Sequence, residues 1–246
     1  MKKYLFIMII AFVPSLVIAQ AAGGTITRPN KTRKASQTSN INKNPNIKII
    51  SEKDKTCELS SGINAIPCIN KNKSGEFIIP AAVNGYTVVK IGDFAFQDCY
   101  KITSIRIPQT VKSVGKNAFF GCSSLKEIEL PSSITKMEGA FLYCQSLTTV
   151  KLPQYIDQLD GFWACNSLEK IEIPSTVKKI NWGTFVGCSK LSVVISRITM
   201  PFNIEKENPF NGISSKAILY VPKGTSQLYK EAGWNKYFSE IVENNE

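Results

Sequence analysis

The sequence predicts an α/β solenoid that is mostly strand and loop, with about six stacked coils, one parallel sheet of short strands and a cap at each end. First, a Phe-x-x-Cys motif recurs five times at intervals of 21 to 23 residues. Second, the segment after each cysteine alternates apolar and polar residues, as around Ile128 and Leu130, which is typical of a strand with one buried face. Third, the four complete units place a proline nine residues after the cysteine, where it ends the strand because it has no N–H.

Residues 1–19 have the composition of a secretory signal peptide. Lys2 and Lys3 precede a long apolar run, and Val17 and Ala19 are the small residues expected before a cleavage site. A membrane anchor is the alternative, but the run is short and contains Pro14. We therefore expect an exported chain with no transmembrane segment after cleavage.

Residues 20–56 are predicted to be a basic, flexible linker. Residues 25–56 contain no aromatic residue and carry a net charge of +6 out of +11 for the whole chain. Such a composition buries too little apolar surface to fold alone. It fits a solvated spacer, or a tether that makes electrostatic contact with anionic surface polymer or lipid headgroups. Nucleic acid is not expected as a partner of an exported chain.

Residues 57–75 are expected to form the N-terminal cap. Cys57 and Cys68 lie here, ahead of the repeats and eleven residues apart. Because an exported protein with seven cysteines invites disulfide formation, we predict that these two cysteines pair and staple the cap.

Residues 76–213 hold the repeats. Their five motif pairs are Phe96/Cys99, Phe119/Cys122, Phe141/Cys144, Phe162/Cys165 and Phe185/Cys188. The distance from each proline to the next cysteine varies from 12 to 14 residues, whereas the distance from cysteine to proline is constant. One side of each coil is therefore expected to be a stacked strand, where a one-residue deletion would turn the buried face outward, and the other side a tolerant loop.

Residues 214–246 are expected to supply the last strand and the C-terminal cap. Thr225 to Ala232 suits a short helix, with Thr225 as N-cap and Gly233 after its end. The aromatic residues that follow would cover the last coil, because the open end of a solenoid must be protected.

The repeats resemble those of BspA-like leucine-rich repeat proteins. The match lies in stretches such as IPQTVKSVGKNAFFGCSSLKEI and IPSTVKKINWGTFVGCSKLSVV, and it covers about residues 76–246. The resemblance implies a right-handed leucine-rich-repeat superhelix in an exported bacterial protein, often with adhesive or host-matrix-binding roles.

The five repeat cysteines are predicted to be buried, inert thiols, because cysteine packs as a small hydrophobe and the degraded sixth unit has Ile213 in the same slot. They are Cys99, Cys122, Cys144, Cys165 and Cys188. Occasional bridging between neighbours is the alternative, although parallel side chains give poor disulfide geometry. We expect no metal site and no cofactor.

Large apolar residues recur in the position directly after the repeat phenylalanine. This position should lean outward, so Phe120, Leu142 and Trp163, with Tyr143 and Trp182 nearby, are predicted to form an exposed ligand-binding patch. The alternative is that these side chains are half-buried under the return loops.

The functional prediction is a non-enzymatic protein-interaction module. The chain has no histidine, which excludes catalysis by Ser-His-Asp or Cys-His groups, and it contains no phosphate-cradling loop. The outward-facing Arg106, Glu129, Lys151 and Glu172 alternate in sign, which indicates a surface charge ladder. We expect a monomer, at the cell surface or secreted, that binds a protein such as host extracellular matrix. The alternative is a periplasmic scaffold for envelope components.

Overall fold

The computed structural model describes residues 46–61 and 68–244. The predicted signal peptide and most of the predicted linker lie outside these residues.

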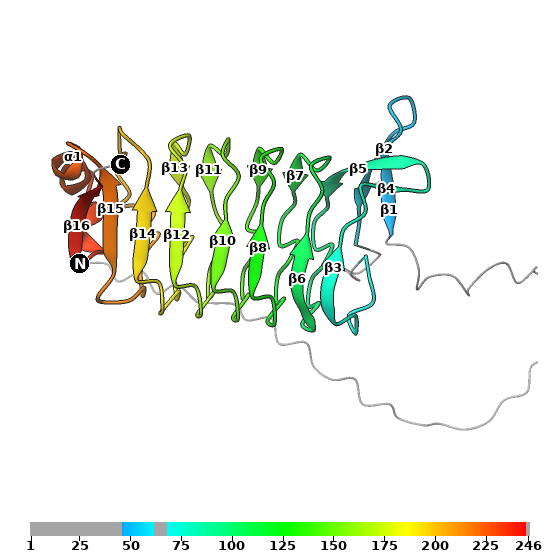
Figure 1. The fold of residues 1–246 in the computed structure, drawn as a ribbon, viewed down its shortest axis with the longest axis horizontal. Helices are drawn as coiled ribbons and strands as arrows, with labels where there is room; N and C mark the ends of the chain where they lie inside the picture. The colour runs from blue at the N-terminus through cyan, green and yellow to red at the C-terminus, as the bar shows by residue number, and fades with distance from the viewer. Residues whose placement is uncertain (1–45, 62–67, 245–246) are drawn as a thin grey trace, which may run out of the picture. The chain divides into compact units, whose positions relative to one another are not determined.

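One long parallel sheet forms a face of the solenoid (Figure 1). Its eight strands are, in sheet order, β16 (Glu240–Asn244), β15 (Ile218–Pro222), β14 (Val193–Ser196), β12 (Lys170–Ile173), β10 (Thr149–Lys151), β8 (Glu127–Glu129), β6 (Ile102–Arg106) and β3 (Gly75–Ile78). Equivalent repeat positions pair in register, since Ile128 aligns with Ile105 on one side and Val150 on the other. The predicted stacking of coils is therefore confirmed.

The return side of the coils also forms strands, where the sequence predicted only loop. The strands β5 (Tyr86–Ile91), β7 (Ser113–Val114) and β9 (Lys136–Met137) pair in parallel, and β4 (Ala82–Val83) pairs antiparallel with β5. A separate two-stranded ladder joins β11 (Gln158–Leu159) to β13 (Lys179–Ile180). The single predicted sheet is thus corrected: stacking coils at strand spacing brings their return backbones into hydrogen-bonding range as well.

The folded body begins earlier than predicted. Strand β1 (Ile47–Ser51) lies inside the expected linker, and it pairs antiparallel with β2 (Thr56–Leu59), which in turn pairs with β5. Ile47 packs against the core, and Lys48 lies 3.6 Å from the carboxylate of Glu58. Averaging composition over a long basic segment concealed this short apolar stretch.

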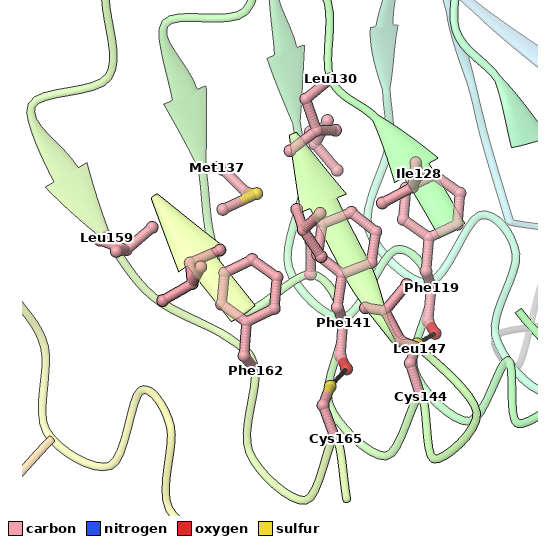
Figure 2. Packing of buried hydrophobic residues seen from close by; sticks show 14 of the residues in the cluster. Phe119, Ile128, Leu130, Met137, Phe141, Cys144, Leu147, Leu159, Phe162 and Cys165 are labelled. Atoms are coloured by element: carbon pink, nitrogen blue, oxygen red, sulfur yellow. Dashed lines mark hydrogen bonds between the residues drawn. The ribbon is translucent and has the colours of Figure 1, made fainter. Parts of the chain in front are cut away.

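A column of phenylalanine rings runs through the centre of the coils. Rings of adjacent coils are 5.1 to 5.5 Å apart between centroids and nearly parallel. The column consists of Phe96, Phe119, Phe141, Phe162, Phe185 and Phe210. Figure 2 shows three of these rings side by side, with the cysteines at the base of the column. Every ring is almost completely buried, so the column is the centre of the hydrophobic core.

The return ladder is interrupted where two coils are short. Compared with the full-length coils, the segment between Pro131 and Cys144 lacks one residue and the segment between Pro153 and Cys165 lacks two. No strand pairing joins β9 to β11 within the described residues. The shortened coils touch backbone to backbone at Gly161, where an added Cβ would lie 2.4 Å from the Cα of Gly139.

The C-terminal cap contains the predicted helix. It comprises α1 (Ser226–Glu231), a 3-10 turn at Trp234–Lys236 and β16, and Gly233 has the left-handed φ of 81° that ends the helix. Thr225 is the N-cap residue, but its hydroxyl donates to the Pro222 carbonyl and accepts no hydrogen bond from a helix N–H. Trp234 is completely buried against Phe210.

A carboxylate from β16 takes over the capping role. Glu243 accepts hydrogen bonds from the backbone N–H groups of Gly224 at 2.9 Å and Ser226 at 3.0 Å. These bonds favour the ionised form and lower the pKa of Glu243 to about 2. The interaction joins the start of the helix to the last strand of the long sheet.

We predict that Glu243→Gln removes a pH-dependent part of the stability of the cap. The folded-state pKa of Glu243 is depressed, so its contribution is complete above the ordinary value of 4.5 and is lost as the pH falls towards about 2. Urea unfolding at several pH values across this window should show a steeper acid loss for the wild type than for the variant. Glu240→Gln, at an exposed position of the same strand, is the control. Parallel pH profiles for wild type and Glu243→Gln would contradict the assignment.

We predict that Gly161→Ala destabilises the chain by at least about 3 kcal/mol, since the new methyl group overlaps the Gly139 backbone and the φ of 91° is unfavourable for alanine. Gly85→Ala is the matched control, because Gly85 has a similar φ of 81° but no atom within 4 Å of the added Cβ. Its cost should be only about 1–2 kcal/mol of backbone strain. Equal midpoints of chemical unfolding for the two variants would refute the close backbone contact.

Candidate binding surfaces

The repeat cysteines form a buried column beside the phenylalanine rings. All five are completely buried, and four of their thiols donate to the carbonyl of the repeat phenylalanine one coil earlier, as drawn for Cys144 and Cys165 in Figure 2. The Sγ–O distances are 3.0 to 3.2 Å. Burial raises the pKa of each thiol, to about 12 for Cys99 and Cys188. These groups are therefore held as neutral, unreactive thiols.

The predicted disulfide between Cys57 and Cys68 is absent from the structure, where both are free thiols. Cys57 lies on β2, aligned with Val88, and its Sγ is 3.8 Å from the Tyr86 carbonyl oxygen. The N–H of Cys68 donates to the Ala95 carbonyl at 2.7 Å. The two cysteines contact different parts of the first coil, a placement that their separation in sequence does not reveal.

The five residues predicted to bind ligand are brought together as two aromatic pairs and a leucine. Phe120 lies 5.4 Å from Tyr143, and Trp163 packs edge-on against Trp182 at 5.2 Å, measured between ring centroids. Trp182 is 62% exposed and Tyr143 is 39% exposed. The other three side chains are half-buried. We call Phe120, Leu142, Tyr143, Trp163 and Trp182 the aromatic strip.

The aromatic strip is less exposed to solvent than the predicted patch. The repeat position leans outward, but the next coil covers part of each side chain. At Trp163, for example, an added Cβ on Gly183 would lie 3.5 Å from the indole ring. The strip consequently presents Trp182 and Tyr143 to solvent on a base of half-buried residues.

The outer face of the long sheet carries ion pairs between neighbouring strands. Lys151 pairs with Glu129 at 2.5 Å, Arg197 pairs with Glu172 at 2.8 Å, and Arg106 pairs with Glu76. Shallow hollows of about 490 and 470 Å³ lie over these strands. The predicted alternation of charge is thus an inter-strand ladder, and each of its carboxylates lies against a cation.

A third hollow lies at the interruption of the return ladder and was not predicted. It has a volume of about 710 Å³, and we call it the notch. Its lining includes Lys116, Lys136, Glu138, Leu142, Asp157 and Asp160. The signal in the sequence is the shortened period of these two coils, which distinguishes the fixed side of the coil from the variable side but does not by itself indicate a hollow.

Asp160 is the half-buried charged group of the notch. Its carboxylate accepts a hydrogen bond from the side-chain amide of Asn181 at 3.2 Å. Burial raises its pKa, and the neighbouring carboxylate of Glu138 adds to this effect. Asn181 precedes Trp182, so the bond ties the notch to the coil that carries the exposed tryptophan.

Two broader features complete the description of the surface. Within residues 46–61 and 68–244, no three acidic or cysteine side chains gather in a way that could hold a metal ion. The helices in the same part of the chain are all too short or too polar to cross a bilayer.

We predict that native protein resists thiol alkylation. Iodoacetamide at mildly alkaline pH should leave the five repeat cysteines unmodified, because they are buried and their pKa values are raised, and should modify them after unfolding in denaturant. Mass spectrometry of the labelled peptides measures both states. Rapid labelling of Cys144 in the folded protein would show that the column is open.

Comparison with known proteins identifies the repeat. The model of the BspA type leucine rich repeat region matches residues 89–206 in six copies. No curated protein matches the chain.

Three solved structures illustrate the similarity. A leucine-rich repeat protein from T. pallidum is 21% identical with a TM-score of 0.57, over 80% of this chain and 94% of that one. A leucine-rich repeat protein from Bacteroides capillosus is 26% identical with a TM-score of 0.34, covering 58% and 88% of the two chains. A leucine rich cell surface protein from Faecalibacterium prausnitzii is 19% identical with a TM-score of 0.30, covering 79% and 70%. The first similarity supports the fold, and the six matched copies identify residues 89–206 as a BspA type leucine rich repeat region.

Proposed function

We propose that this chain is an exported, non-enzymatic interaction module that binds a host or matrix protein at the cell surface or after secretion. The observation that carries the proposal is the aromatic strip, in which Trp182 is 62% exposed and packs against Trp163. Tryptophan and tyrosine are enriched among the residues that dominate binding energy at protein interfaces.

The scaffold supports a recognition role. Leucine-rich repeat proteins are generally protein-interaction modules, and stacked coils present an extended surface with fixed spacing. The half-buried base of the aromatic strip holds its exposed rings in place, so little side-chain entropy is lost on binding. This arrangement suits a protein surface of matching shape.

The charges of the long sheet support a non-enzymatic role. The carboxylates of Glu76, Glu129 and Glu172 each lie against a cation of a neighbouring strand. Carboxylates paired in this way fit a surface charge ladder between neighbouring strands better than a catalytic pair.

The amino-terminal sequence supports export. Residues 1–19 have the pattern of a signal peptide, and residues 20–45 add basic residues without acidic ones. A basic segment between a signal peptide and a folded domain suits contact with an anionic cell envelope. Surface display therefore accounts for the sequence in front of the solenoid.

The location is tested by adding protease to intact producing cells and blotting for the solenoid. Digestion or trimming without lysis supports surface display. Full protection, with digestion after lysis, would instead favour a periplasmic scaffold.

We predict that Trp182→Ala weakens partner binding about tenfold or more, since the exposed indole is the most prominent group of the strip. Binding of the purified chain to immobilised extracellular-matrix protein would be measured by surface plasmon resonance. Tyr155→Ala is the control, because Tyr155 is 60% exposed and lies outside the strip. Equal losses for both variants, or none for Trp182→Ala, would contradict the assigned surface.

A further inference from the structure

The notch is a preformed feature of the fold. The two shortened coils meet at Gly139 and Gly161, where the backbones leave no room for a side chain. The hollow is lined by the two short coils and by Lys116 and Asn117 of the full-length coil that precedes them. A hollow of about 710 Å³ lies within the range of ~300–1,000 Å³ that is typical of ligand sites.

The charged groups of the notch differ from those of the long sheet. On the long sheet, acidic and basic side chains pair across the strands. In the notch, none of Lys116, Lys136, Glu138, Asp157 and Asp160 takes part in an ion pair within the described residues. Apart from the hydrogen bonds that Asn181 and the Gly161 backbone donate to Asp160, these charged groups are open to a partner.

Charge and burial within the notch favour a cation. Asp160 is half-buried, whereas Lys116 and Lys136 are exposed and extend into solvent. Asp160 and Glu138 both line the notch, and the negative charge of Glu138 adds to the effect of burial in raising the pKa of Asp160. A cation placed between Asp160 and Glu138 would relieve this repulsion, and Leu142 and Met137 supply an apolar surface for the chain that carries it.

We propose that the notch binds an arginine side chain from a segment of the protein partner. The guanidinium donates to the carboxylates of Asp160 and Glu138, and its methylene groups contact Leu142 and Met137. Arginine suits the site better than lysine because its planar group donates to two carboxylate oxygens at once. This inference rests on the proposed function, since it takes the partner to be a protein, and it extends the binding surface from the aromatic strip through their shared residue Leu142.

The test uses the purified full chain labelled with nitrogen-15 and the probe N-acetyl-arginine-amide. The amide resonances of Gly139, Gly161 and the Asn181 side chain should shift and saturate, while the buried Trp234 indole should not move. N-acetyl-citrulline-amide, which has nearly the same shape but no charge, is the matched ligand control. Asp160→Asn and Glu138→Gln should each weaken binding about tenfold, because each removes a charge-assisted hydrogen bond. Glu127→Gln, at an exposed acid on the long sheet, should leave it unchanged.

Several outcomes would overturn the inference. These are no saturable shift with the arginine probe, equal shifts with the citrulline probe, or full affinity in the Glu138→Gln variant. Glu138 is exposed, so that variant tests the site even if Asp160→Asn fails to fold. A neutral sugar that displaces the arginine probe and binds more tightly would also overturn it. Because the titration needs no partner, a chain that binds matrix protein but ignores arginine refutes the notch alone, whereas a chain that binds arginine but no protein refutes only the proposed function.

Discussion

One packing requirement governs this structure. Each coil must place its phenylalanine ring against the rings of the coils on both sides. The rings repeat at 5.1 to 5.5 Å, close to the spacing of neighbouring strands. One periodicity therefore satisfies the aromatic column and the hydrogen bonds of the long sheet. The cysteine thiols follow the same spacing, since four of the five reach back to a phenylalanine carbonyl of the preceding coil.

The last coil of the stack must be covered. At the carboxyl-terminal end, side chains that do not belong to the repeats cover it. Phe210 meets Trp234 and Phe238, at tilted and edge-on angles, in place of a further parallel ring of the column. The indole N–H of Trp234 donates to the Phe202 carbonyl at 2.9 Å, so a large ring is buried without an unsatisfied donor. Glu243 then links the helix to the sheet, and the cap becomes part of the same cooperative unit.

The coils are constrained on one side and free to vary on the other. On the long sheet the strands from β6 to β16 pair without a register shift, because a shift of one residue would expose the core face, and a bulge at Gly75 and Glu76 is confined to the pairing of β3 with β6. On the return side, two coils are shorter than the others, and no strand pairing joins β9 to β11 in the described residues. The notch lies at this interruption of the ladder. The aromatic strip lies in the turns between these sides. Four of its residues stand inside the constant Phe-x-x-Cys motif, and Trp182 alone lies in the segment whose length varies.

The sequence by itself determined the stacked coils, the buried cysteine column, the strand positions of the long sheet and the helix near Thr225. Each of these features repeats, or depends on neighbours close in the chain, so periodicity and local propensity are enough to reveal it. Other features came only from the tertiary structure: the pairing of β2 with β5, the different surroundings of Cys57 and Cys68, and the notch. They depend on contacts that occur once and join residues from different coils. A repeating pattern carries no signal for such contacts, because they result from how unequal coils settle against one another in space.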